Sequence, residues 1–167
     1  GSFHKGSDGS MYFGGVNGLN MFHPDSIKGN TFVSKVVLTD FLLFNKSVKV
    51  PQSTSSNVQS NQPINTAKEI VLDYTDYIFA FEFSALNFRQ PEKILYKYKL
   101  EGLDDNWIVT NYKNRRATYT DLSAGTYTFK VKASNSDGLW NEKSTSITVI
   151  VLPPWWLLWW VKILYIV

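Results

Sequence analysis

The chain has 167 residues, a formal net charge of +3, 44% hydrophobic and 16% aromatic residues, and no cysteine. This length and composition predict one folded domain with extensions, and they argue against intrinsic disorder. The small charge, spread without a long run of Lys or Arg, argues against nucleic-acid binding, and the absence of cysteine excludes disulfides and thiol chemistry.

The first 28 residues contain two short apolar runs around a glycine-rich turn. The runs Met11 to Phe13 and Leu19 to Phe22 flank the sequence GGVNG, and this pattern predicts a β-hairpin. A lone two-stranded hairpin is marginally stable in water. We therefore expect residues 1–28 either to pack on something else or to move.

From residue 32 to residue 152, short β-rich runs alternate with turn sequences. The runs expected to form strands are 32–44, 48–50, 69–73, 77–88, 94–101, 116–120, 126–134 and 144–151. The polar segment 52–66 is predicted to be a disordered loop. About seven short strands with frequent turns and no helical periodicity predict an all-β protein that folds as a β-sandwich.

The end of this region shows the clearest strand pattern. The runs 116–120, 126–134 and 144–151 predict three antiparallel strands joined by short turns. In the middle run, Tyr127 begins a series of apolar residues that alternate with polar ones. Tyr127 lies two residues after Gly125, so its hydroxyl can reach back to the turn, as in the tyrosine corner of immunoglobulin-like sandwiches.

The character of the sequence changes at Pro153 and Pro154, which stop the last predicted strand. The following sequence, WWLLWWVKILYIV, carries one charge and has four tryptophans near its start: Trp155, Trp156, Trp159 and Trp160. Tryptophans gather at membrane interfaces, and a spanning helix needs roughly 20 apolar residues. We predict that residues 153–167 are a juxtamembrane segment and the truncated start of a transmembrane helix. The alternative is an amphipathic or core-buried helix.

Several residues of the strand region carry a resemblance to a known family. They are Tyr96, Tyr98, Leu100, Gly102, Trp107, Tyr119, Leu122, Gly125, Tyr127, Phe129, Val131, Ala133, Asn135, Gly138 and the sequence PPWW. In order and spacing, residues 32–156 resemble the Y_Y_Y domain of bacterial hybrid two-component sensors, which has an immunoglobulin/fibronectin III-like fold. The sequence DGSMYFGGVNGLNMFHPDSI resembles one repeat of the β-propeller that precedes this domain. The resemblance therefore implies a propeller-blade remnant at 1–28 and the sandwich at 32–152.

Residues with catalytic chemistry are sparse. His4 and His23 lie in the N-terminal segment, far in sequence from any carboxylate cluster, and the neighbouring acids Asp104 and Asp105 are explained as turn residues. No phosphate-binding loop or metal-ligand spacing occurs. We therefore predict no catalytic, cofactor-binding or metal-binding residue in this segment.

The structural candidates are the family-motif residues Tyr96, Tyr98, Gly102, Trp107, Tyr119, Leu122, Gly125, Tyr127, Gly138 and Trp140. Of these, Trp107 and Trp140 lie in predicted turns and are the best candidates for surface contact, although core-capping or interface packing is favoured for Trp140. Signal transmission and membrane contact are assigned to Pro153, Pro154, Trp155, Trp156, Trp159 and Trp160.

The resemblance implies that the parent is a sensor histidine kinase of a hybrid two-component system, located in the inner membrane with this segment in the periplasm. The sandwich would relay ligand binding by the propeller to the membrane helix within a homodimer. The segment itself would be no enzyme and would need no cofactor, and a glycan ligand would bind elsewhere in the parent. The alternatives are a carbohydrate- or protein-binding sandwich module, and the sensor region of a helix-turn-helix transcriptional regulator.

Overall fold

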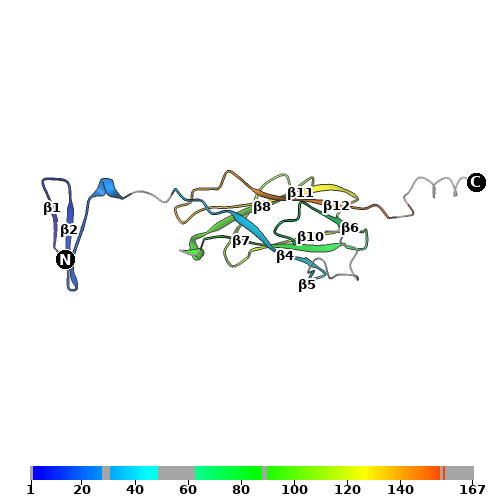
Figure 1. Cartoon of the computed structure of the whole chain (residues 1–167), viewed down its shortest axis with the longest axis horizontal. Coiled ribbons are helices and arrows are strands. Elements are labelled where there is room, and N and C mark those ends of the chain that lie inside the picture. The colour runs from blue at the N-terminus through cyan, green and yellow to red at the C-terminus, as the bar shows by residue number, and fades with distance from the viewer. Residues whose placement is uncertain (1, 28–30, 49–62, 88–89, 155, 157–167) are drawn as a thin grey trace, which may run out of the picture. The chain divides into compact units, whose positions relative to one another are not determined.

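The computed structural model describes residues 2–27, 31–48, 63–87, 90–154 and 156. It divides into two compact units, residues 1–31 and 32–167 (Figure 1). The first unit is a three-stranded antiparallel sheet in the order β1-β2-β3, followed by a short 3-10 turn. Its elements are β1 (Phe3–Lys5), β2 (Met11–Gly15), β3 (Gly18–Phe22) and η1 (Pro24–Ser26).

The predicted hairpin in the first unit is confirmed by the pairing of β2 with β3, in which Met11 lies opposite Phe22. The sequence does not predict β1, because three residues are too few for an alternation to be recognised. One side of this small sheet is aromatic, because the Phe13 ring stacks between the rings of Phe3 and Phe22. The centroid of Phe13 is 6.2 Å from that of Phe3 and 5.7 Å from that of Phe22. All three rings remain more than a third exposed.

The second unit is a two-sheet sandwich, which confirms the predicted all-β class. The four-stranded sheet has the order β10-β7-β4-β5, and the five-stranded sheet has the order β6-β12-β11-β8-β9. The strands of the first sheet are β4 (Val36–Leu43), β5 (Lys46–Ser47), β7 (Ile78–Ala85) and β10 (Arg116–Thr120). Those of the second are β6 (Glu69–Leu72), β8 (Leu95–Glu101), β9 (Ile108–Asn111), β11 (Gly125–Ala133) and β12 (Thr145–Val151), and η2 (Pro91–Lys93) precedes β8.

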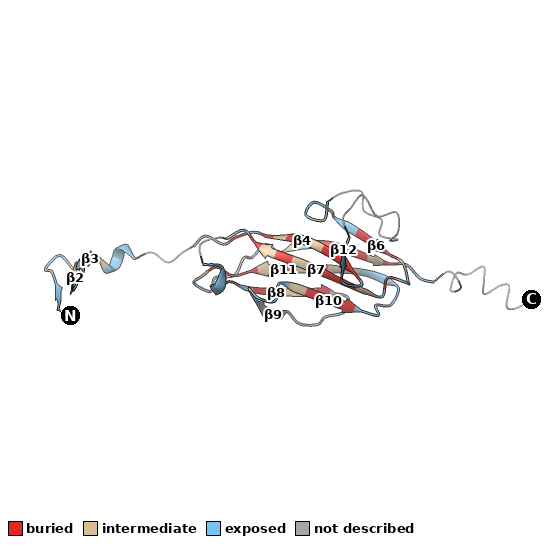
Figure 2. Cartoon of the chain, turned by 90° about the horizontal axis from the view of Figure 1, so that it is seen from below, coloured by how far each residue is buried: buried red, intermediate tan, exposed pale blue. Residues whose placement is uncertain are grey.

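The core lies between the two sheets and consists mainly of alternate residues of their strands. Phe81 from β7 and Phe129 from β11 meet across it with ring centroids 4.5 Å apart, and neither ring is exposed to solvent. Figure 2 shows buried positions recurring along β4, β7, β11 and β12. Because a buried aromatic ring removes a large apolar surface from water, these phenylalanines supply much of the driving force for folding.

The prediction of three consecutive antiparallel strands at the end of the sandwich is wrong for the first of them. β11 pairs with β12 as expected, but β10 pairs with β7 in the opposite sheet, with Tyr119 across from Phe79. The chain crosses between the sheets after β10, where Asp121 has a φ of 52° and its N–H donates to the carbonyl of Tyr77. Alternation identifies a strand but does not indicate which neighbour it pairs with, so the sequence could not reveal this crossing.

Two further expectations need correction. The edge strand expected at 48–50 begins earlier, as β5, which pairs with β4 through a tight turn where Phe44 and Asn45 have positive φ. Val48 also donates its N–H to the Phe41 carbonyl, and residues 49–50 lie outside the described residues. The sequence also does not predict β9, because its four residues show little alternation. Residues 49–62, Phe88, Trp155 and 157–167 lie outside the described residues, so the predicted membrane helix and most of the predicted disordered loop remain predictions. The end of that loop is ordered, because the N–H groups of Thr66 and Ala67 both donate to the Pro63 carbonyl at 2.9 Å.

The chain enters the sandwich at one end and leaves it at the other. At the entry end, Val36 of β4 pairs with Ala85, whose N–H donates to the Tyr96 hydroxyl. At the exit end, Val151 of β12 pairs with Gly125, the first residue of β11. β12 lies between β11 and β6, and its pairing with β6 is parallel. The last strand is therefore held on both sides before the chain leaves.

Candidate functional site

Three family-motif tyrosines, Tyr96, Tyr119 and Tyr127, each place a ring against the core and a hydroxyl on a specific polar partner. We call them the tyrosine clamps. Tyr96 on β8 is 2% exposed, and its hydroxyl accepts the N–H of Ala85 at 3.1 Å. Since β8 and β7 belong to different sheets, this hydrogen bond joins the two layers. The Tyr96 ring packs on Phe83, with centroids 5.4 Å apart.

The second clamp, Tyr119, connects β10 to the turn after β8. Its hydroxyl donates to Oδ2 of Asp104 at 3.2 Å, and the same oxygen accepts the N–H of Leu100 at 2.7 Å. Burial, together with the negative charge of Asp104, raises the pKa of Tyr119 well above its usual range. Burial also raises the pKa of the half-buried Tyr98. Both phenols therefore stay neutral even in moderately alkaline solution.

The third clamp, Tyr127, forms the corner that its position predicts. Its hydroxyl donates to the carbonyl of Ser123 at 3.0 Å, which ties the start of β11 to the crossing loop. The ring also lies on Gly102, where φ is +99° and an added Cβ would fall 2.9 Å from the ring. Leu122, in the same loop, packs against the core. At Gly125 a Cβ would make only ordinary contacts, so the structure gives no steric reason for glycine there.

Removing the third clamp's hydroxyl should have a small, measurable cost. We expect Tyr127→Phe to lower the free energy of unfolding by about 0.5–1.5 kcal/mol, because one net hydrogen bond is lost while the ring stays in place. Chemical denaturation followed by tryptophan fluorescence measures the change. Tyr12→Phe, in the other unit, is the control and should leave the stability of the sandwich unchanged. An unaltered midpoint in Tyr127→Phe would show that the corner contributes nothing.

At the entry end, a buried asparagine, one of the residues that carry the family resemblance, shapes the loop after β11. Asn135 is 0% exposed, and its Oδ1 accepts the N–H groups of Asp137 at 3.0 Å and Leu139 at 2.8 Å. Gly138 follows with a φ of +84° and free space around it, so glycine is required there by backbone conformation. The Asn-Ser-Asp-Gly sequence predicts a turn. The burial of the Asn135 side chain depends on tertiary packing, which the sequence does not show.

The two candidate surface tryptophans lie over the outer face of the five-stranded sheet, under lysine side chains. Lys97 Nζ is 4.3 Å from the ring centroid of Trp140, and Lys132 Nζ is 4.9 Å from that of Trp107. Lys99 also approaches Trp107, at 5.4 Å. Cation–π contacts of this kind stabilise a strand face. They also occupy ring surface that a stacked sugar would need, so the geometry favours a structural role.

The exit from the sandwich is held by the edge strand β6. The N–H of Leu152 donates to the carbonyl of Leu72 at 2.9 Å, and Pro153 and Pro154 follow directly. Trp156 is 46% exposed and meets the Tyr74 ring edge-on at a centroid distance of 5.0 Å. Trp155, Trp159 and Trp160 lie outside the described residues.

The turn that carries Tyr74 is itself ordered by two aspartates. Asp76 Oδ2 accepts the N–H of Asp73 at 3.0 Å, and Asp73 Oδ1 accepts the N–H of Tyr74 at 2.7 Å. Burial raises the pKa of Asp76. These short-range bonds fix the loop between β6 and β7, against which the exiting chain lies. Within the described residues, no cluster of three or more His, Cys, Asp or Glu could hold a metal ion.

The chain is similar to a protein family and to several known proteins. The family model of the Y_Y_Y domain matches residues 87–152, a range that contains all three tyrosine clamps. Histidine kinase P4 of Formosa agariphila is 37% identical over 156 residues, which is 93% of this chain and 11% of that protein.

Two solved structures from B. thetaiotaomicron are also similar, each described as the extracellular domain of a hybrid two-component system. One has a TM-score of 0.66 and 26% identity, covering 89% of this chain and 19% of the solved chain. The other has a TM-score of 0.61 and 27% identity, covering 92% of this chain and 20% of the solved chain. The chain thus spans a fifth or less of the proteins that it matches. Residues 87–152 of its sandwich match the Y_Y_Y domain, and its relatives are a histidine kinase and the extracellular domains of hybrid two-component systems.

Proposed function

We propose that this chain is an extracytoplasmic, juxtamembrane segment of a two-component sensor histidine kinase, and that it relays ligand binding from an upstream propeller to a transmembrane helix. The relatives support the extracytoplasmic position, since two of them are extracellular domains. We place the segment in the periplasm, as part of an inner-membrane protein that acts as a homodimer. Kinase activity would belong to the parent protein, of which this chain is a small part.

The observation that carries this proposal is the path of the chain through the sandwich. The chain enters beside Val36 and leaves after Val151, at opposite ends of the two sheets. β12 is hydrogen-bonded to β11 on one side and to β6 on the other, so its end cannot shift without breaking ladder bonds. A displacement at the entry end would therefore move the exit end as a rigid body rather than be absorbed inside the domain.

The two prolines after β12 would extend this stiffness beyond the sandwich. Each proline fixes its own φ near −65°, and Pro154 also restricts the conformation of Pro153. Within the described residues, no helix is long and apolar enough to span a bilayer. In the proposal, residues 153–167 are the juxtamembrane segment and the start of the membrane helix.

Replacing Pro153 and Pro154 by glycine in the full-length receptor tests the relay. We expect ligand-dependent autophosphorylation to fall to the level without ligand, because two glycines make a flexible joint that absorbs motion. Ligand affinity, measured by calorimetry, should be unchanged. Pro63→Gly, a change to an exposed proline away from the exit, is the matched control and should signal normally. Normal signalling through the Gly-Gly joint would refute the relay.

A further inference from the structure

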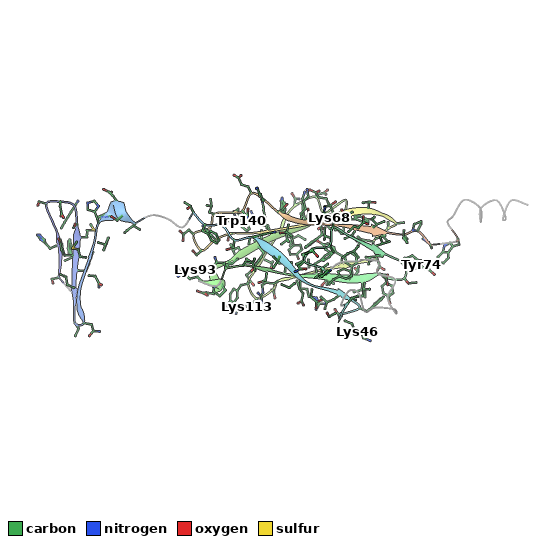
Figure 3. The ribbon with its side chains drawn as sticks, viewed as in Figure 1. Lys46, Lys68, Tyr74, Lys93, Lys113 and Trp140 are labelled. Carbon is green, nitrogen blue, oxygen red and sulfur yellow. The ribbon has the colours of Figure 1, made fainter. Side chains whose placement is uncertain are left out.

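The outer face of the four-stranded sheet contains a groove of about 690 Å³ that none of the sequence motifs explains. It is formed where β10 and the turn before it meet β7 and β4. The lining residues are Thr39, Glu82, Phe83, Ser84, Lys113, Asn114, Arg115, Arg116 and Thr118. Figure 3 shows Lys113 on the opposite side of the sandwich from Trp140, so the groove is separate from the lysine–tryptophan contacts.

The groove is lined by more positive than negative side chains. Lys113, Arg115 and Arg116 face a single lining carboxylate, Glu82. Glu82 lies opposite Arg116 in the β7–β10 ladder, yet neither residue forms an ion pair with any residue that the structure describes. Asp40 lies opposite Glu82 on the other side of β7. Its carboxylate accepts hydrogen bonds from the Ser47 hydroxyl and from the N–H of Phe41, both at 2.8 Å.

The two guanidinium groups are oriented by neutral partners and keep donors to spare. Arg115 Nη1 donates to Ser84 Oγ at 2.9 Å, and Arg116 Nη2 donates to Asn45 Oδ1. Arg116 Nε is buried and has no hydrogen-bond partner among the described residues. A guanidinium has five N–H donors in a planar fork, and a buried donor without an acceptor costs free energy. Among the described residues, no carboxylate accepts a hydrogen bond from either guanidinium.

Sulfate, phosphate and carboxylate groups match this arrangement. They accept two parallel N–H bonds from one arginine, and such charge-assisted bonds are stronger than neutral ones. The hydroxyls of Thr39, Ser84 and Thr118 add polar contacts suited to the same ligand. The only aromatic lining residue, Phe83, is 1% exposed, so the groove offers no ring on which a neutral sugar could stack. We infer that this groove is a binding site for an oxyanion, either free or carried by a saccharide.

Titration of the whole chain with sodium sulfate tests this inference. The probe is amide NMR at constant ionic strength, with sodium chloride as the reference salt. We expect saturable shifts centred on residues 113–118, with a dissociation constant of about 1 mM or tighter. Glucose 6-sulfate and glucuronate distinguish the two sources of the oxyanion: tighter binding than inorganic sulfate indicates a saccharide-borne group, and equal binding indicates the free ion. Glucose itself should not bind.

Three variants connect the response to the groove. Arg116→Gln should weaken sulfate binding by about tenfold or more, because it removes a charged donor pair. Arg116→Lys keeps the positive charge but loses the planar pair of N–H donors, so it should also weaken sulfate binding. Lys132→Gln removes the same charge from the other sheet and should bind sulfate like the unmodified chain. Melting temperatures confirm that each variant is folded.

Either of two results would overturn the inference. The first is the absence of saturation up to about 20 mM sulfate, far above the expected dissociation constant. The second is equal loss of binding in Arg116→Gln and Lys132→Gln, which would show that only net charge matters. The experiment does not involve signalling, so its result is independent of the proposed relay.

Discussion

Replacing Tyr96 by alanine is expected to lower the free energy of unfolding of the sandwich by about 3–5 kcal/mol, as for other large aromatic truncations in protein cores. The ring is 2% exposed and packs on Phe83, so its removal leaves a cavity between the sheets. The truncation also removes the acceptor for the N–H of Ala85. Such a loss is a large fraction of the roughly 5–15 kcal/mol by which native domains are stable. Chemical denaturation measures the effect, with circular dichroism as a check on the fold.

Tyr96→Phe separates the ring from the hydroxyl. It keeps the packing but leaves the buried N–H of Ala85 without its acceptor, at a cost of about 1–3 kcal/mol. Tyr74→Phe is the matched control, because Tyr74 is an exposed tyrosine whose hydroxyl has no recorded partner among the described residues. Full stability of Tyr96→Phe would show that the link between the sheets contributes nothing. Full stability of Tyr96→Ala would contradict the sandwich itself.

The second large effect is expected at Asn135. Its Oδ1 satisfies the N–H groups of Asp137 and Leu139, and the side chain is fully buried. Asn135→Ala therefore removes two hydrogen bonds, each worth about 0.5–1.5 kcal/mol, so the loss of stability should be at least about 1 kcal/mol. Denaturant unfolding measures it, and faster hydrogen exchange of the Leu139 amide reports the loop directly.

Asn135→Asp is the informative companion to this change. The carboxylate can accept both N–H bonds, but it places a charge in a fully buried position and should still destabilise the domain. Ser136→Ala, one residue further along, removes only a bond to the exposed Asp137 side chain and should change stability by less than about 0.5 kcal/mol. If Asn135→Ala behaves like Ser136→Ala, the buried amide does not hold the loop.

The sequence predicts the parts of the fold that are determined by local alternation. β7, β8, β11 and β12 all appear close to their predicted ranges, because each has apolar residues at every second position. The Tyr127 corner is likewise local, since its acceptor, Ser123, lies four residues away. The crossing of β10 to the opposite sheet depends on its pairing with β7, which lies far away in sequence. No local pattern encodes such a choice.

In the candidate site, too, the sequence indicates individual residues but not their long-range partners. The motif identifies Tyr96 and Tyr119 as notable, but their partners, Ala85 and Asp104, become visible only in the structure. Trp107 and Trp140 are predicted to lie near the surface, whereas their lysine partners depend on the register between β8 and β11. The Arg115–Arg116 pair is visible in the sequence only as two adjacent basic residues. Its position beside Ser84 and a groove follows from the β7–β10 pairing.

The parallel pairing of β6 with β12 has a consequence for the order in which the domain assembles. β6 pairs with residues 148–151, and the hydroxyl of Thr145 donates to the Val36 carbonyl from 109 positions away. Such long-range closure is slow and cannot occur before the last strand has left the ribosome. Until then, the apolar faces of the earlier strands lack their cover and are open to aggregation or to chaperones. Residues 145–151 therefore act as the closing strand, and the apolar tail follows directly after it.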